Sequence, residues 1–86
     1  MRDKNKLSLL FGKGLLVKAT VVPARFKQDH WMLQVETVES KQIYLSRVGY
    51  NEVKIYRNLT AALEDGKRIG FKEANIEYLK TIKPSK

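Results

Sequence analysis

The chain has 86 residues, of which 43% are apolar and 30% are charged, a composition typical of a folded protein rather than of a disordered one. It contains no cysteine, which excludes a disulfide framework and a thiolate metal site. The formal net charge of +8 is compatible with a polyanionic partner, although many proteins carry such charge for solubility alone.

The length predicts a single domain, residues 1–86, with a compact core and little room for a deep cleft. Apolar runs are short, as in Leu9-Leu10-Phe11, whereas a membrane span needs about 18 residues. The Gly-Lys-Gly of residues 12–14 also breaks the apolar run that a signal peptide requires. We therefore expect a soluble, cytoplasmic protein without a membrane partner. Residues 1–6 and 80–86 hold more than half of the charge excess and are expected to be basic tails.

Four short strands are predicted in the first two thirds of the chain, because β-branched and apolar residues alternate with polar ones between turn-forming segments. They cover residues 15–22, 30–38, 42–48 and 53–56. In the first strand, alternation places Val17 with Ala19 and Val21 on the buried face, and Pro23 ends the strand. In the fourth strand, the same alternation turns Ile55 inward.

The clearest helix is predicted at residues 59–69, after Asn58 as N-cap. Its apolar stripe consists of Leu59, Ala62, Leu63 and Ile69. Gly66 lies on the same stripe, which indicates a close approach to the sheet. Gly70 is expected to end the helix in the left-handed conformation, with Phe71 folding back onto the last turn.

A final strand is predicted at residues 74–79. Residues 6–11 fit two patterns. Leu7, Leu9 and Phe11 alternate as in a strand, but Leu7, Leu10 and Phe11 share a helical face; we favour a strand. The predicted class is therefore α+β, an antiparallel sheet of four to five strands with one helix packed on one face, in the order β-β-β-β-α-β. The expected core contains Val17, Leu33, Leu45, Ile55, Leu59, Leu63 and Ile69.

The sequence provides little for catalysis or for a metal. His30 is the only histidine, and no signature places a nucleophile beside it. Glu64 and Asp65 are adjacent on the predicted helix and point about 100° apart, so they do not form an acid–base pair. The Gly-Lys-Gly at residues 12–14 is too short for a phosphate-binding loop. We expect a protein that is not an enzyme and has neither a metal nor a cofactor.

Interleaved cations and aromatics are the main functional feature of the sequence. Arg25 and Lys27 flank Phe26 after the first strand, and further cations and tyrosines follow across the third and fourth strands. The candidate nucleic-acid-binding residues are Arg25, Lys27, Arg47, Lys54, Arg57, Tyr44 and Tyr56. Such residues suit single strands, where bases stack and phosphates pair, or a sheet laid into a duplex groove. They are also ordinary residues for a solvated sheet face.

Three segments carry a family resemblance: Ile43-Tyr44-Leu45-Ser46-Arg47, then Lys54 through Leu63 (Lys-Ile-Tyr-Arg-Asn-Leu-Thr-Ala-Ala-Leu), then Ile69-Gly70-Phe71. Together they resemble small proteins associated with partition or stability of proteobacterial plasmids. In those proteins a strand ending in Arg precedes a "Ser-Leu-Asp-Ala-Ala" helix and a "Leu-Gly" stop. Asn58 stands here where Ser is usual, and Thr60 where Asp is usual. The resemblance implies an accessory protein of a mobile genetic element and transfers no site residues.

Two hypotheses follow. The first is a small basic accessory protein of a plasmid or phage that binds nucleic acid, DNA rather than RNA, through a basic, tyrosine-bearing sheet face. The second is a protein-binding module with an acidic protein partner, such as an inhibitor or adaptor acting on a host or mobile-element complex, as anti-defence proteins do. The sequence leaves the oligomeric state open.

Overall fold

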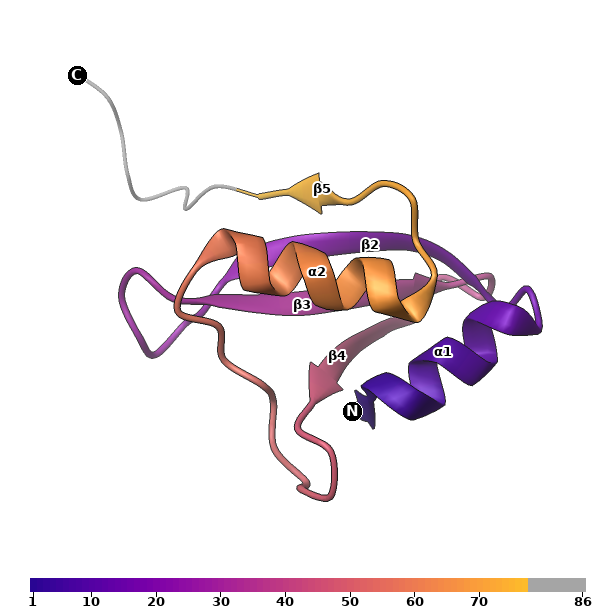
Figure 1. The fold of residues 1–86 in the computed structure, drawn as a ribbon, viewed down its shortest axis with the longest axis horizontal. Coiled ribbons are helices and arrows are strands. Elements are labelled where there is room, and N and C mark those ends of the chain that lie inside the picture. Colours follow the sequence, from indigo (N-terminus) through magenta and orange to yellow (C-terminus); the bar gives the residue numbers. More distant parts are fainter. Residues whose placement is uncertain (78–86) are drawn as a thin grey trace.

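A computed structural model describes residues 1–77 of the chain, which form a five-stranded mixed sheet and two helices (Figure 1). In chain order the elements are β1 (Arg2–Asp3), α1 (Lys4–Gly12), β2 (Leu16–Pro23), β3 (Trp31–Thr37), β4 (Gln42–Ser46), α2 (Leu59–Ile69) and β5 (Asn75–Ile76). The predicted α+β class is confirmed. The predicted order with a single helix is wrong, because the chain forms a second helix before β2.

The sheet has the strand order β1-β4-β3-β2-β5. Its centre is an antiparallel meander of β2, β3 and β4, as predicted. The two outer strands are only two residues long and run parallel, β1 to β4 and β5 to β2. The prediction of an antiparallel sheet is therefore wrong at both edges. A local pattern could not show this, because the partners, such as Arg2 with Leu45 and Val21 with Ile76, are distant in the chain.

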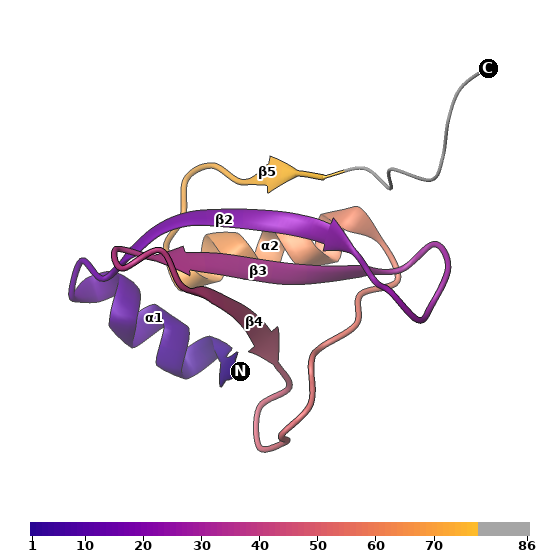
Figure 2. The same cartoon turned by 180° about the vertical axis from the view of Figure 1, so that it is seen from behind.

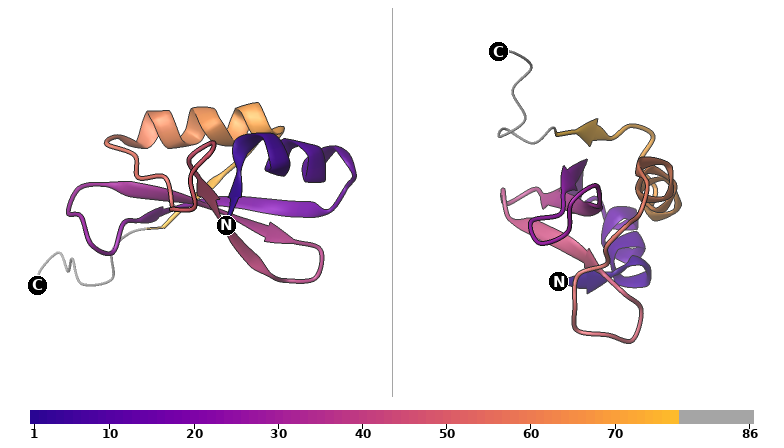
Figure 3. Two further views of the ribbon diagram at one scale, coloured as in Figure 1. Left: turned by 90° about the horizontal axis from the view of Figure 1, so that it is seen from below. Right: turned by 90° about the vertical axis from the view of Figure 1, so that its left-hand side faces the viewer.

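Both helices lie on one face of the sheet, and within residues 1–77 no helix or strand covers the other face (Figures 2 and 3). The helices contact each other, and α2 also packs on β2 and β3. Between helices and sheet lies one core, whose largest fully buried side chains are Leu7, Leu33, Leu45, Val21 and Val35. The described residues therefore form two layers, and on the side of the sheet away from the helices the strand residues are mostly partly exposed, although Val22 is buried.

The strand favoured at residues 6–11 is wrong, because this segment forms α1. Asp3 caps the helix: its carboxylate accepts a hydrogen bond of 2.9 Å from the backbone N–H of Lys6. Leu7 is fully buried, and Leu10 and Phe11 pack against the core, which is the helical face of the segment. Residues 2–6, expected in a basic tail, thus belong to β1 and the start of α1.

A bulge changes which side chains of β2 are buried. The pairing register with β3 shifts between Leu16 and Lys18, so the strict alternation expected for this strand is interrupted at Val17. Leu16 is buried together with Ala19 and Val21, whereas Val17 is 55% exposed. The predicted place of Val17 in the core is therefore wrong.

Residues 53–56 form no strand, although they run beside the sheet. Two isolated bridges hold them, Ser46 with Val53 and Trp31 with Tyr56. The latter bridge exchanges two backbone hydrogen bonds of 2.9 and 2.8 Å. Tyr56 is buried here and Ile55 is 41% exposed, which reverses the predicted orientation.

The helix predicted at residues 59–69 is confirmed as α2. Asn58 caps it, since its side-chain oxygen accepts a hydrogen bond of 2.8 Å from the N–H of Ala61. Gly70 ends it at φ +138°, and the N–H of Phe71 donates to the carbonyl of Gly66 at 3.1 Å. Of its stripe, Ala62 and Ile69 are buried, and Leu59 and Leu63 pack against the core from half-buried positions.

Of the strand predicted at residues 74–79, the described part of the chain forms Asn75–Ile76 as β5. Residues 78 and 79 and the predicted tail at residues 80–86 lie outside the described residues. Ile76 pairs with Val21, and the N–H of Glu77 donates to the carbonyl of Val21 at 2.9 Å. Within residues 1–77, neither helix has the length and apolar character that crossing a bilayer requires.

Gly70 and Gly66 make a matched pair for a stability test. A Cβ at Gly70 would stand 2.5 Å from Cδ1 of Phe11, and the positive φ is itself unfavourable for alanine. A Cβ at Gly66 would meet only Leu33, at an ordinary 4.0 Å, so the expected close approach to the sheet is not tight. We expect Gly70→Ala to lower the free energy of unfolding by about 1–3 kcal/mol and Gly66→Ala to raise it by about 0.5–1 kcal/mol. Urea denaturation measures both, and equal midpoints for the two variants would contradict this account.

Candidate functional site

The open face of the sheet carries almost no net positive charge. Register places Thr20 beside Gln34 and Gln34 beside Tyr44 on this face, opposite to the buried side chains of Val21, Leu33 and Val35. The next row across the same strands is Lys18, Glu36 and Gln42, in which Lys18 pairs with Glu36 at 3.7 Å. The expected basic sheet face is therefore not formed by these strands.

The seven candidate residues are instead distributed over four places. Tyr44 alone lies on the open face. Arg47 follows β4 and makes an ion pair of 3.2 Å with Glu52. Lys54 and Tyr56 turn toward the helices and contact Asp65. The remaining three, Arg25, Lys27 and Arg57, lie on segments that leave the sheet at the same end.

Backbone pairing explains why these three residues share one end. Pro23 pairs with Trp31, and Trp31 is bridged antiparallel to Tyr56. The chain after Pro23, before Trp31 and after Tyr56 therefore leaves the sheet at the same end. Arg57 follows Tyr56 directly, and residues 24–30 connect β2 to β3 at that end. Figure 1 shows this loop beside the start of α2. We call Arg25, Lys27 and Arg57 the basic end.

Local hydrogen bonds shape the loop of residues 24–30. The N–H of Ala24 donates to the carbonyl of His30 at 2.9 Å, and the N–H of His30 donates to the carbonyl of Lys27 at 3.3 Å. Nδ1 of His30 lies 2.8 Å from the carbonyl of Gln28, which can only accept, so Nδ1 carries the proton. Asp29 adopts φ +61°. These contacts define the conformation from which the intervening side chains project.

The basic end is exposed and lacks carboxylate partners in the described chain. Arg25, Lys27 and Arg57 are all exposed. Among residues 1–77 none of the three is within 4.0 Å of a carboxylate. Asp29 is the one acidic residue of the loop. Between Arg25 and Lys27, Phe26 is 99% exposed.

Arg47 is in a different situation from the basic end. Its guanidinium is 3.2 Å from Oε1 of Glu52 and 4.3 Å from the ring centroid of Tyr50. A cation over the face of a tyrosine is favourable, so Arg47 is already occupied by two neighbours of its own loop.

A buried carboxylate forms the most elaborate polar cluster of the structure. Oδ2 of Asp65, on α2, accepts hydrogen bonds from Nζ of Lys54 at 2.8 Å and from the hydroxyl of Tyr56 at 2.6 Å. Oδ1 lies 3.5 Å from the guanidinium of Arg68 and 4.0 Å from Nζ of Lys4. The side chain of Asp65 is only 4% exposed, whereas the three cations reach it from the surface. Three segments thus meet at one carboxylate: α1, residues 53–56 and α2 itself.

The cluster keeps Asp65 ionised despite its burial. Burial alone raises the pKa of this carboxyl, but hydrogen bonds from Lys54 and Tyr56 and the charges of Lys54 and Lys4 outweigh it, so the pKa lies below its usual value. Burial, followed by the hydrogen bond to Asp65 and the charge of Asp65, raises the pKa of Tyr56 far above its usual value. Tyr56 therefore acts as a neutral donor and is not an exposed stacking ring.

Sequence reasoning missed Asp65, although a signal was present. Asp65 lies three residues after Ala62 and four before Ile69, both of which are buried, so it occupies the apolar stripe of α2. An acidic residue at such a position requires buried donors, and Lys54 and Tyr56 supply them from the preceding segment.

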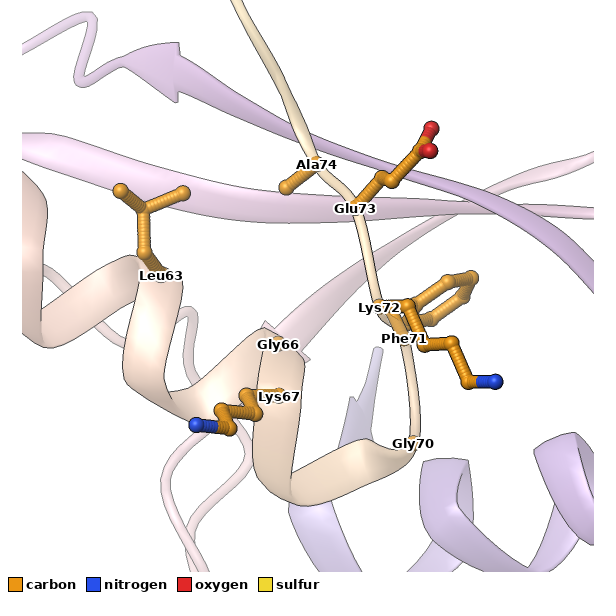
Figure 4. Close-up of a pocket in the computed structure, with 8 residues that line it drawn as sticks. All are labelled: Leu63, Gly66, Lys67, Gly70, Phe71, Lys72, Glu73 and Ala74. Carbon is orange, nitrogen blue, oxygen red and sulfur yellow. The ribbon is translucent and has the colours of Figure 1, made fainter.

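Shallow hollows flank the C-terminal end of α2. One, of about 470 Å³, is lined by Leu63, Gly66 and residues 70–74 together with Lys67, whose amino group points outward (Figure 4). Another, of about 590 Å³, lies between residues 70–75 and the start of β2. Asp65 and Tyr56 line neither of them. Within residues 1–77, no three His, Asp or Glu side chains are grouped as a metal site would require.

Comparison of the chain with protein-family models, with curated proteins and with solved structures finds no significant match.

Asp65 should control how stability depends on pH. Because its pKa is lowered in the folded state, the cluster stabilises the fold at neutral pH, and this contribution disappears as pH falls below about 4. We expect Asp65→Asn to lower the free energy of unfolding by about 1–3 kcal/mol at pH 7. The deficit should shrink when urea denaturation is repeated near pH 3. Glu64→Gln, at the exposed neighbouring position on α2, is the matched control and should change little. A deficit of Asp65→Asn that stays constant from pH 7 to 3 would contradict the assignment.

Proposed function

We propose that this chain works by binding rather than by catalysis, and that its ligand is nucleic acid held at the basic end. The observation that carries the proposal is the arrangement of Arg25 and Lys27 on either side of an exposed aromatic ring, with Arg57 from another segment at the same end. Unpaired cations near a phosphate backbone release counterions on binding, which is the main source of affinity for nucleic acids.

The basic end is a better phosphate site than Arg47 and Lys54, the other two candidate cations, because carboxylates compete for those two. Arg47 and Lys54 each lie within 4.0 Å of a carboxylate. A phosphate that approaches either of them must displace or share that partner. Among residues 1–77, Arg25, Lys27 and Arg57 meet no such competitor. They are therefore free to pair with phosphates without breaking an existing contact.

The ligand class is proposed as DNA, and the setting as an accessory protein of a plasmid or phage. Support for this finer assignment comes from the resemblance of residues 43–76 to small plasmid partition or stability proteins. The alternative is an acidic protein partner at the same basic end, since arginine and aromatic residues often anchor protein interfaces. Salt dependence separates the two, because phosphate binding weakens steeply with ionic strength.

A triple substitution tests the proposal. Arg25→Gln/Lys27→Gln/Arg57→Gln should weaken binding to a labelled DNA oligonucleotide in fluorescence anisotropy. The slope of log affinity against log salt should become shallower by about 2–3, because each phosphate contact contributes about 0.7–0.9.

The matched control is Lys13→Gln/Lys67→Gln/Lys72→Gln, which also removes three positive charges. Lys13 follows α1, and Lys67 and Lys72 lie at the C-terminal end of α2 and just after it. All three lysines are exposed, and among residues 1–77 none of them is within 4.0 Å of a carboxylate. Equal losses in the two triple variants would show that only overall charge matters. Absence of binding to DNA and RNA at about 50 mM salt would refute the nucleic-acid proposal and leave the acidic protein partner.

A further inference from the structure

Phe26 is the most exposed large apolar side chain of the described residues. Its exposure is 99%, whereas the other exposed large apolar side chains lie between 39% and 60%. A ring with this exposure makes no contribution to the core, and both of its faces are open to a ligand. Aromatic rings beside cations are the residue types with which single-strand-binding proteins stack bases and pair with phosphates.

The loop that carries Phe26 is braced on both sides. Residues 24 and 30 are joined by a backbone hydrogen bond, and His30 is fixed to Lys27 and Gln28 by two further contacts. The loop connects the two longest strands of the sheet, which pair from Leu16–Thr37 to Pro23–Trp31. The backbone that carries the ring is therefore already ordered, and only the side-chain rotamer of Phe26 has to be fixed when the ring stacks on a ligand.

Phe26 differs in this respect from the other aromatics near cations. Tyr50 already has the guanidinium of Arg47 at 4.3 Å from its ring centroid. Tyr56 is buried, and the ammonium of Lys54 lies 5.0 Å from its centroid. Only Phe26, among these three rings, combines open faces with neighbouring cations that have no carboxylate partner in residues 1–77.

We propose that Phe26 stacks on an unpaired base, so that the protein binds single-stranded nucleic acid in preference to an intact duplex. The inference rests on the function proposed above. In a duplex both faces of each base are covered by neighbouring pairs, and a ring reaches them only after unstacking. In a single strand the faces are accessible, and aromatic stacking is effective for every base. Arg25 and Lys27 then pair with the phosphates on the two sides of the stacked base.

The test compares a thymine oligomer of about 12 nucleotides, within the usual footprint of single-strand-binding domains, with an abasic oligomer of the same length and with a blunt duplex. The probe variant is Phe26→Leu, which keeps an apolar side chain and removes the ring. We expect it to lose about 10-fold in affinity for the thymine oligomer and to bind the abasic oligomer as the unaltered protein does. Tyr50→Leu, which removes an exposed ring already covered by Arg47, is the control and should bind all three ligands normally.

The outcomes distinguish a failure of base stacking by Phe26 from a failure of the proposed nucleic-acid binding. An equal loss on thymine and abasic oligomers, or no loss on either, overturns stacking while the effect of the basic end on affinity still supports nucleic-acid binding. Tighter binding of the unaltered protein to the duplex than to the thymine oligomer also overturns it. Absence of binding to all three ligands at low salt overturns both proposals. Urea denaturation of Phe26→Leu should match the unaltered protein, because the ring has no packing contact to lose.

Discussion

The carboxylate of Asp65 is a point at which separate parts of this small fold are tied together. It sits on α2 between the helix layer and the segment that leads from the sheet into α2, and it receives Lys54 and Tyr56 from that segment. Lys4 brings the start of α1 to the same group. Segment 53–56 has only two isolated bridges to the sheet. The polar contacts at Asp65 therefore hold this segment in addition to its backbone pairing and the burial of Tyr56, and α2 begins shortly after it.

The parts of the fold that could be predicted from the sequence are those defined by local signals. Asn58 and Gly70 cap α2 as expected, because a capping side chain and a positive-φ glycine act within one turn. The apolar residues at 6–11 fit both periods, and two features that favour the helix, the cap at Asp3 and the shared core of α1 and the sheet, lie outside that window. The bulge at Val17 and the parallel edges depend on partners far along the chain, which a single sequence does not reveal.

For the candidate site, too, the residue types could be predicted from the sequence, but their positions in space could not. The sequence identifies the cations, but a regular fourth strand at residues 53–56 would place them on a sheet face. Once that segment is irregular, Lys54 turns toward Asp65, while Arg57 continues past the end of the sheet beside Arg25 and Lys27. The buried acid thus has a second effect: it draws cations of the helix side into internal contacts. The cations that remain without partners in the described chain include those of the basic end.

The two outer strands have a consequence for how copies of this protein behave toward one another. β1 and β5 cover the meander with only two residues each, and each closes onto a strand distant in the chain. Because pairings between distant residues form more slowly than local hairpins, we expect the edges of β2 and β4 to be covered after the central hairpins have formed. Open strand edges invite pairing with a second chain. With a net charge of +8, two chains repel one another before their edges can meet, so the basic character of the sequence also protects the fold against aggregation during its own assembly.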